Sequence, residues 1–495
     1  MAATIDREQY DEHEYERMRA KLEQCLMALD VLLQRPDFGV GPQTLGAEVE
    51  YFLVDEDGHP LGRNQEIHGA VTDERLTKEV IRYNVESNLT PVPLAGRPFD
   101  AMCREMDEIA AMVDRTAAEH GGRTVSIGTL PTLRSEHLGL AAVTDEARYR
   151  ALDNRLRKMR TQPHQVDIAG EDHLLAQAND VSLEGANTSF QLHVRVDPSR
   201  FVDLYNAAQI ATAPVLAVAG NSPFFLGHRL WEETRIALFQ QSVDFRDDHR
   251  ARTLPPRVAF GERWLERSAM EVFAEAVRTH EPILPILSDE DPRAAVHVGK
   301  IPGLDELRMH VGSIWTWNRA IYDPNAGGHL RVELRALPAG PTTIDMAANA
   351  AFLLGLTLAV CEEAAAWTIL LSFDQARDNF YRAAQHGLEA QLLTPFGGGD
   401  GLTRSTARDL GLELLAPSRR ALLAHDVETD DIDGLFALLE ERISTGRTGA
   451  HWQRATAAAL EPRYGWERAL ATMTRRYIDA MTSGEPVHTW PLPAS

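Results

Sequence analysis

Hydrophobic residues recur along the chain with two spacings, and each spacing predicts one kind of element. Helical spacing occurs in residues 8–34, 99–119, 145–159, 202–219 and 342–371, and again from residue 376 to the end. Alternation with a period of two, typical of strands, occurs in residues 45–53, 83–88, 190–196 and 330–337. Scattered strands among long helices indicate an α+β fold rather than a regular series of βαβ units.

The two longest apolar runs are expected to be buried helices. They cover Ile210–Gly220 and Ala350–Val360, and both are too short to span a bilayer. The first 24 residues are charged and lack the apolar region of a signal peptide. Three widely separated cysteines have neither a zinc spacing nor a redox spacing. We therefore expect a cytoplasmic protein with no membrane partner.

All four alternating segments place ionisable and amide side chains on one face. These side chains are Glu48, Glu50, Asn84, Glu86, Asn88, Gln191, His193, Arg195, Arg331, Glu333 and Arg335. One such strand alone is usually the solvated face of an antiparallel sheet. Here the four faces lack lysine, and several carboxylates on one face repel each other unless a cation lies between them. Mg²⁺ prefers oxygen ligands and leaves room for phosphates, which arginine binds bidentately. The pattern therefore predicts a magnesium–nucleotide site.

Net charge narrows the choice of partners. The formal charge of −23 argues against nucleic acid, whose binding proteins carry a basic surface. The hydrophobic fraction of 44% and the charged fraction of 25% are ordinary for a globular protein. Neither GxxxxGK[ST] nor GxGxxG occurs, so a standard nucleotide-binding motif is excluded.

A series of motifs in order resembles the glutamate–cysteine ligase family, a branch of the glutamine synthetase-like carboxylate–amine ligases. They are GAEVE at 46–50, Glu79 and Glu86 before Thr90-Pro91, SFQLH at 189–193, NSP at 221–223, ETR at 233–235, WNRAIYD at 317–323 and HLRVELRALPAGP at 329–341. Two details depart from the family pattern. One extra residue lies between Glu86 and Thr90-Pro91, and Gln191 replaces the first histidine of a His-x-His pair.

The resemblance implies a saddle of antiparallel sheet with helices packed on its outer side. It also implies ATP and two or three Mg²⁺ ions, with Mn²⁺ as a substitute, on the concave face. The implied ligands of one ion are Glu50, Glu79 and Glu86. Those of a second are Glu48, Glu333 and either Gln191 or His193, a choice that the sequence leaves open.

Cationic side chains near these glutamates are expected to bind phosphate or carboxylate groups. They are Arg331, Arg335, Arg235 and, as a phosphate contact, His193. The alternative for each is structural: an ion pair for the arginines and a hydrogen-bonded sheet histidine for His193. Glu79 has an alternative too, a solvated helix face, since Leu76–Ile81 has helical spacing. Trp315 and Trp317 could shape the substrate pocket or belong to the core.

The implied reaction joins the side-chain carboxylate of glutamate to the amine of cysteine through an acyl phosphate. Alternatives are a ligase for another carboxylate or amine, a guanidino-kinase-like phosphotransferase and a non-catalytic relative. The sequence identifies neither the general base nor the oligomeric state, and a homo-oligomer is compatible with it. We expect one catalytic domain over residues 1–495, with an N-terminal helix in 1–40, the saddle in 41–345 and a mainly helical region in 346–495.

Overall fold

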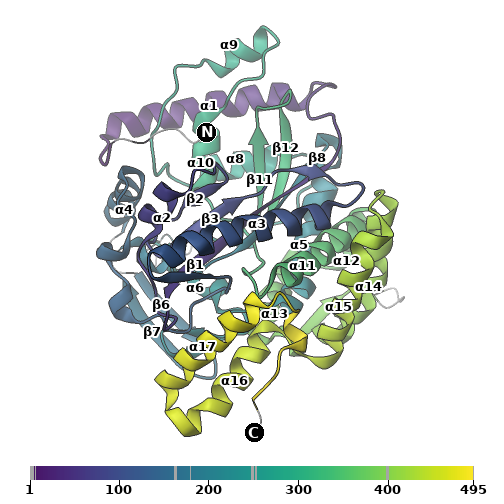
Figure 1. The fold of residues 1–495 in the computed structure, drawn as a ribbon. Helices are drawn as coiled ribbons and strands as arrows, with labels where there is room; N and C mark the ends of the chain where they lie inside the picture. Colours follow the sequence, from purple (N-terminus) through teal and green to yellow (C-terminus); the bar gives the residue numbers. More distant parts are fainter. Residues whose placement is uncertain are drawn as a thin grey trace.

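An antiparallel sheet forms the centre of the protein (Figure 1). The computed structural model describes the chain apart from residues 1–4, 6, 161–163, 179, 247–249, 251–252, 397–400 and 494–495. Its main strand order is β11-β12-β8-β1-β3-β2, and β4 and β5 also pair with β1. The bounds are β1 Thr44–Asp55, β2 Leu76–Lys78, β3 Asn84–Asn88, β4 Val92–Pro93, β5 Gly122–Val125, β8 Phe190–Val196, β11 Asn318–Asp323 and β12 His329–Leu334.

Each central strand separates an apolar face from an ionisable face, as the period of two requires. In β1, Ala47, Val49 and Tyr51 are buried in the largest hydrophobic cluster, and Glu48 and Glu50 occupy the opposite face. The strand register then aligns functional residues of neighbouring strands. The aligned pairs are Glu48 with Gln191, Glu50 with Glu86 and Glu333 with His193.

Long helices cover the apolar face of the sheet. They are α3 (Pro98–Glu119), α5 (Phe201–Ala219) and α11 (Thr343–Cys361), whose side chains join the same hydrophobic cluster as the strands. Two segments, Pro198–Ala219 and Thr343–Cys361, are apolar enough to cross a membrane by length and composition. However, 89% of the apolar window in each is buried inside the protein, so the prediction of buried core helices is confirmed.

Smaller elements surround the open side and the edges of the sheet. The helices are α1 Glu12–Leu33, α2 Asn64–Ala70, α4 Ala147–Met159, α6 Thr234–Ser242, α8 Met270–Thr279, α9 Pro292–His297 and α10 Asp305–Gly312. Two hairpins join them, β6 His164–Ala169 with β7 His173–Ala178, and β9 Phe224–Phe225 with β10 His228–Arg229. The α1 helix begins at a capping box in which Asp11 and Glu14 exchange hydrogen bonds.

The C-terminal region is mainly helical, as expected, with two differences. Its helices are α12 Ala364–Leu370, α13 Phe373–His386, α14 Ala407–Ala424, α15 Thr429–Thr445, α16 Gly449–Tyr464 and α17 Trp466–Thr482. A hairpin of β13 (Gln391–Thr394) and β14 (Thr403–Thr406) interrupts the helical pattern expected after residue 376. The single helix expected over 342–371 is two, because α11 ends at Cys361 and α12 begins after Glu363.

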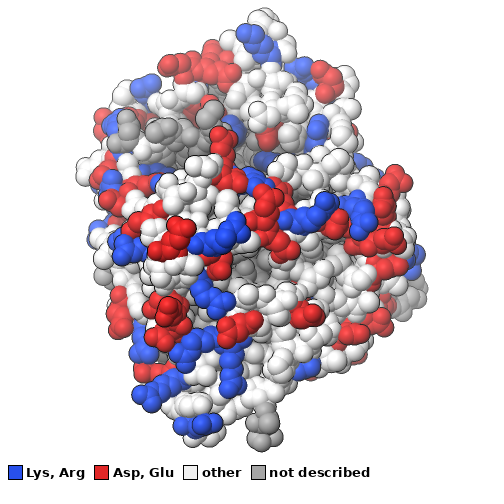
Figure 2. Space-filling model, viewed as in Figure 1, with Lys and Arg blue, Asp and Glu red and all other residues white. Residues whose placement is uncertain are grey.

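The surface carries its charge in a mixed pattern. On the face shown in Figure 2, acidic and basic side chains alternate, and the basic ones over α16 and α17 have acidic neighbours. The α+β fold with an antiparallel sheet, packed helices and a helical C-terminal region agrees with the prediction. The fold therefore presents the ionisable face of the sheet as the place to look for a site.

Candidate active site

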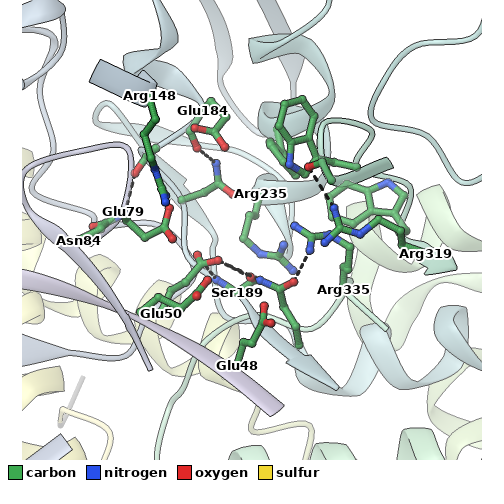
Figure 3. Close-up of a pocket in the computed structure, with 18 residues that line it drawn as sticks. Glu48, Glu50, Glu79, Asn84, Arg148, Glu184, Ser189, Arg235, Arg319 and Arg335 are labelled. Atoms are coloured by element: carbon green, nitrogen blue, oxygen red, sulfur yellow. Dashed lines mark hydrogen bonds between the residues drawn. The ribbon is translucent and has the colours of Figure 1, made fainter. Parts of the chain in front are cut away.

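A polar cavity of about 320 Å³ lies over the ionisable face of the sheet (Figure 3). Seven residues proposed from the sequence as site residues line it, and they are Glu48, Glu50, Glu79, Glu86, Gln191, Arg235 and Arg335. Trp315 and Trp317 line it too, so both help to shape the cavity, although Trp317 is also buried in the core. Strands β1, β3 and β8 contribute side chains because their register places the same face of each strand under the cavity.

His193 lies between two carboxylates at one side of this face. Its Nε2 is 3.0 Å from Glu48 Oε1 and 3.7 Å from Glu333 Oε1, and one ligand atom from each of the three residues lies within 4.8 Å of the others. Both ring nitrogens are buried, and neither has a well-aligned hydrogen bond to a described residue. A buried imidazole within ion-pair distance of two carboxylates has the donor set of a divalent-cation site.

The amide of Gln191 is already engaged. Its oxygen accepts a hydrogen bond from Arg335, and its nitrogen donates to Glu50 Oε1 at 3.1 Å. Of the two candidates on β8, His193 is therefore the one whose side chain lies close to both Glu48 and Glu333. The assignment of the metal ligand itself stays a prediction.

Glu50, Glu79 and Glu86 form a second acidic group. Glu50 accepts hydrogen bonds from the backbone N–H and the hydroxyl of Ser189, both at 2.8 Å. Burial and the neighbouring Glu79 nevertheless raise the pKa of Glu50 to about 7. Burial and the carboxylates of Glu48 and Glu79 raise the pKa of Glu86 well above its ordinary value. Like charges held this close predict a cation between them.

The position of Glu79 corrects one local expectation. Leu76–Ile81 is not a helix, because Leu76–Lys78 forms strand β2 and pairs with β3, with Thr77 opposite Glu86. The chain reverses between the two strands, so Glu79 stands in the turn region and lines the same cavity as Glu86. The solvated helix face considered as an alternative is therefore wrong, and the turn resolves the seven-residue offset.

Glu333 is held by two arginines. Arg319 on β11, directly opposite it, bonds its carboxylate with Nε and with Nη2, the latter at 2.9 Å, and Arg335 donates to Oε1 at 2.7 Å. Burial alone favours the neutral acid, but Arg319 and Arg335 outweigh it and hold the pKa of Glu333 far below its ordinary value. Glu333 therefore stays ionised beneath the cavity wall, which its partners Arg319 and Arg335 line.

The other two predicted arginines have different surroundings. Arg235, at the start of α6, is buried, lines the cavity and lies 3.2 Å from Glu233. Its Nε has no hydrogen-bond partner within the described part of the chain, which leaves a donor for a ligand. Arg331 is not among the residues that line the cavity, and its Nη2 lies 3.4 Å from Asp323. The structure thus brings Arg235 and Arg335 to the cavity and leaves Arg331 in an ion pair.

Sequence reasoning missed three charged residues of the cavity, which are Arg148, Glu184 and Arg319. Arg319 could have been found, because it belongs to the WNRAIYD motif and alternates onto the ionisable face. Arg148 on α4 and Glu184, just after the 3₁₀ turn Val181–Leu183, carry no such signal. Tertiary packing alone brings them to the sheet.

A curled antiparallel sheet with acidic and arginine side chains on its open face, and helices on the other, defines a glutamine synthetase-like ligase fold. The model of glutamate-cysteine ligase family 2 matches residues 44–475, and the chain belongs to this family. The match extends over the sheet, the cavity and most of the C-terminal helices.

Two curated relatives are glutamate–cysteine ligases of halophilic archaea. The Haloferax volcanii protein is 31% identical over 192 residues, which is 37% of this chain and 45% of the relative. The Haloquadratum walsbyi protein is 27% identical over 194 residues, with the same coverage of 37% and 45%. The chain therefore spans less than half the length of the curated relatives it matches.

Two solved structures share the fold. One is the glutamate–cysteine ligase of Francisella tularensis in complex with AMP, with a TM-score of 0.50, 12% identity and coverage of 92% of this chain and 91% of that one. The other is a bifunctional glutathione synthetase from Pasteurella multocida, with a TM-score of 0.50, 10% identity and coverage of 92% and 54%. At these identities the likeness is one of architecture.

Proposed function

We propose that the protein is an ATP- and Mg²⁺-dependent ligase that joins the γ-carboxylate of glutamate to the amino group of cysteine or a related amine. Membership of the family supports this proposal. The observation that carries it is that two clusters of carboxylates on one side of the sheet lie beside the arginines of the cavity, among them Arg235, Arg319 and Arg335. Its partners are small molecules, and we place the enzyme in the cytoplasm, where ATP and free glutamate are available.

The residues of the cavity fit divalent cations. Glu50, Glu79 and Glu86 would hold one ion, and Glu48, His193 and Glu333 another; Mn²⁺ suits the same oxygen and imidazole ligands. The fit is supported by the position of His193 Nε2 beside Glu48 and Glu333 and by the raised pKa values of Glu50 and Glu86. When bound, Mg²⁺ neutralises phosphate charge during the transfer of a phosphoryl group.

The chemistry needs two displacements. A γ-carboxylate oxygen of glutamate bonds to the γ-phosphorus of ATP, and the bond from that phosphorus to ADP breaks. The amine nitrogen then bonds to the acyl carbon, the carbon–oxygen bond to phosphate breaks, and the nitrogen, an ammonium before the reaction, has released two of its three protons in the amide. Arg335 and Arg235 supply fixed positive charge beside the developing anions. The scheme requires no protein nucleophile, consistent with the pKa of Cys25 and of Cys103, which burial raises to about 12.

The first test measures ADP release with Mg-ATP, glutamate and a panel of amines that includes cysteine, with the products identified by mass. We expect ADP release to require both glutamate and an amine, and to yield a γ-glutamyl amide. A phosphorylated guanidine would instead identify a guanidino-kinase-like enzyme. If no product forms with any amine, the chain is either a non-catalytic relative or a ligase for a carboxylate other than glutamate.

A further inference from the structure

A second cavity, of about 510 Å³, adjoins the polar one. The two share Glu79, Arg148, Glu184, Gly312 and Trp315 in their walls. Beyond these residues the second cavity is mostly apolar, and its walls include Val80, Tyr149, Leu152, Ile283, Leu284 and Met309. The magnesium and phosphate chemistry proposed for the polar cavity uses none of these apolar side chains, so the proposed function leaves this space unassigned.

Glu184 stands where the two cavities meet. Its Oε2 is buried and has no hydrogen-bond partner among the described residues, although a buried carboxylate oxygen without a partner is costly. Burial and the neighbouring Glu79 and Glu50 raise the pKa of Glu184 to about 8, and Arg335 and Arg148 offset this rise only in part. Glu184 is also absent from the Glu48–His193–Glu333 group. A positively charged donor from a ligand would satisfy it.

We propose that the apolar cavity receives the amine substrate, with its ammonium group hydrogen-bonded to Glu184 and its carbon substituent against Leu152 and Met309. This inference rests on the proposed ligase function and names the class of its second substrate. The preferred amine carries an apolar substituent larger than the side chain of alanine or cysteine.

Charge complementarity favours an amine over a nucleotide in this space. A nucleobase in the apolar cavity would bring its phosphates past the unpartnered carboxylate of Glu184, which repels them. An ammonium group at the same point makes a charge-assisted hydrogen bond, and the apolar substituent removes the surrounding side chains from water. Arg148, which lines both cavities, lies where a carboxylate of an amino-acid amine could pair with it.

Glu184 would also receive the proton that the amine must lose. The ammonium transfers one proton to the Glu184 carboxylate, the neutral nitrogen bonds to the acyl carbon, and phosphate leaves with the electron pair of the broken carbon–oxygen bond. The nitrogen releases its second proton as the amide forms. No oxidant, reductant or further reactant is needed.

The experiment compares amines of graded apolar size with hydroxylamine, a small nucleophile that is already neutral at pH 8. Wild-type enzyme with Mg-ATP and glutamate is assayed with alanine, cysteine, methionine, leucine and hydroxylamine. We expect kcat/KM to be at least tenfold higher for methionine or leucine than for alanine. A preference for alanine or cysteine over the larger amines would overturn the inference.

Two variants test whether the apolar cavity and Glu184 determine the preference for larger amines. Leu152→Trp fills the cavity, and we expect it to lower kcat/KM for leucine at least tenfold relative to hydroxylamine. Glu184→Gln removes the negative charge and the proton acceptor. We expect it to lower kcat/KM for ammonium substrates more than for hydroxylamine. Leu370→Trp, a matched change at an exposed site on α12, should leave both values unchanged.

The outcomes separate this inference from the proposed function. If Leu152→Trp instead raises KM for ATP or for glutamate and leaves that for the amine unchanged, the cavity holds the nucleotide or the acid, and the inference is wrong. If the wild type forms no γ-glutamyl hydroxamate, the ligase function itself fails. Formation of the hydroxamate without any preference among the larger amines refutes the inference alone.

Discussion

Individual carboxylates of the site differ in the charges that surround them, and this difference separates their roles. Glu333 bonds to Arg319 and Arg335 and stays ionised, whereas Glu50 lies beside Glu79 and, among the residues that the structure describes, bonds to Ser189 and Gln191 but to no arginine. A carboxylate without a protein cation gains most from a metal ion. Glu50 is therefore the residue whose removal should separate catalysis from stability.

The change Glu50→Gln is expected to abolish turnover without unfolding the protein. Glutamine keeps the shape but removes the charge, so ADP release should fall by more than about 100-fold, beyond the usual effect of losing an outer-shell partner of a metal site. The free energy of unfolding without metal should stay within about 1 kcal/mol of wild type, because a repelling charge is lost. Turnover at the wild-type rate in this variant would refute the metal assignment.

The pKa of Glu50 also predicts a pH-dependent effect of Mg²⁺. The folded-state pKa of about 7 lies above the ordinary value of 4.5, so this group stabilises the metal-free protein at low pH, and that contribution is lost as the pH rises through 7. Mg²⁺ competes with the proton. At a fixed Mg²⁺ concentration, the increase in Tm should be larger at pH 8 than at pH 6. If Mg²⁺ raised the Tm of the wild type and of Glu50→Gln equally at pH 6 and at pH 8, this prediction would be contradicted.

Strands β11 and β12 place a buried ion pair across the sheet. Arg319 and Glu333 face each other in register, and the side chain of Glu333 is completely buried. Arg319→Ala leaves Glu333 with one fewer cation in a buried setting, so we expect the free energy of unfolding to fall by about 3–5 kcal/mol. Urea unfolding measures it.

The control for Arg319 is an exposed pair of the same chemistry. Arg475 on α17 lies 2.9 Å from Asp57, and both side chains are exposed. Arg475→Ala should change the free energy of unfolding by no more than about 1 kcal/mol. Similar losses in the two variants would show that Arg319 has no special role at Glu333.

Element by element, the sequence predicts the strands of the site better than their surroundings. The period of two in β1, β8 and β12 is a local property, so the face that carries Glu48, Gln191 and Glu333 follows from spacing alone. The β2 strand was mistaken for part of a helix, because three residues are too few for a period to show. Arg148 and Glu184 could not be found, because only packing between distant segments brings them to the cavity.

At the scale of the whole molecule, a series of hydrogen bonds connects the C-terminal helix α17 to the site. Tyr477 on α17 donates a hydrogen bond to the carbonyl of Ser126 at 2.8 Å and accepts one from Asn221 at 2.8 Å. Asn221 in turn donates its backbone N–H to Glu233, the partner of the cavity residue Arg235. The division of the chain into an N-terminal helix, a saddle and a helical region stays a prediction, and this chain of contacts links the last two parts.

The variant Tyr477→Phe tests that connection. It removes the donor to the carbonyl of Ser126 and one of two acceptors of the Asn221 side-chain amide, which keeps Ala339, so the free energy of unfolding should fall by about 1–3 kcal/mol. We also expect kcat/KM to fall, because Arg235 loses part of its scaffold. Stability and kinetics are measured side by side, with Tyr464→Phe at a more exposed position of α16 as control. An unchanged kcat/KM in a destabilised protein would mean that α17 supports the fold alone.

The two-residue period of β1 makes this strand resemble a reading frame. Adding or removing one residue between Gly46 and Tyr51 would turn Ala47 and Val49 toward the cavity and bury Glu48 and Glu50 in the core. The same edit in the turn after Asp55, where Asp57-Gly58 closes a loop, would shift nothing on the sheet. Single-residue insertions should therefore abolish activity in β1 and be tolerated ten residues away, even though both add the same single residue to the chain.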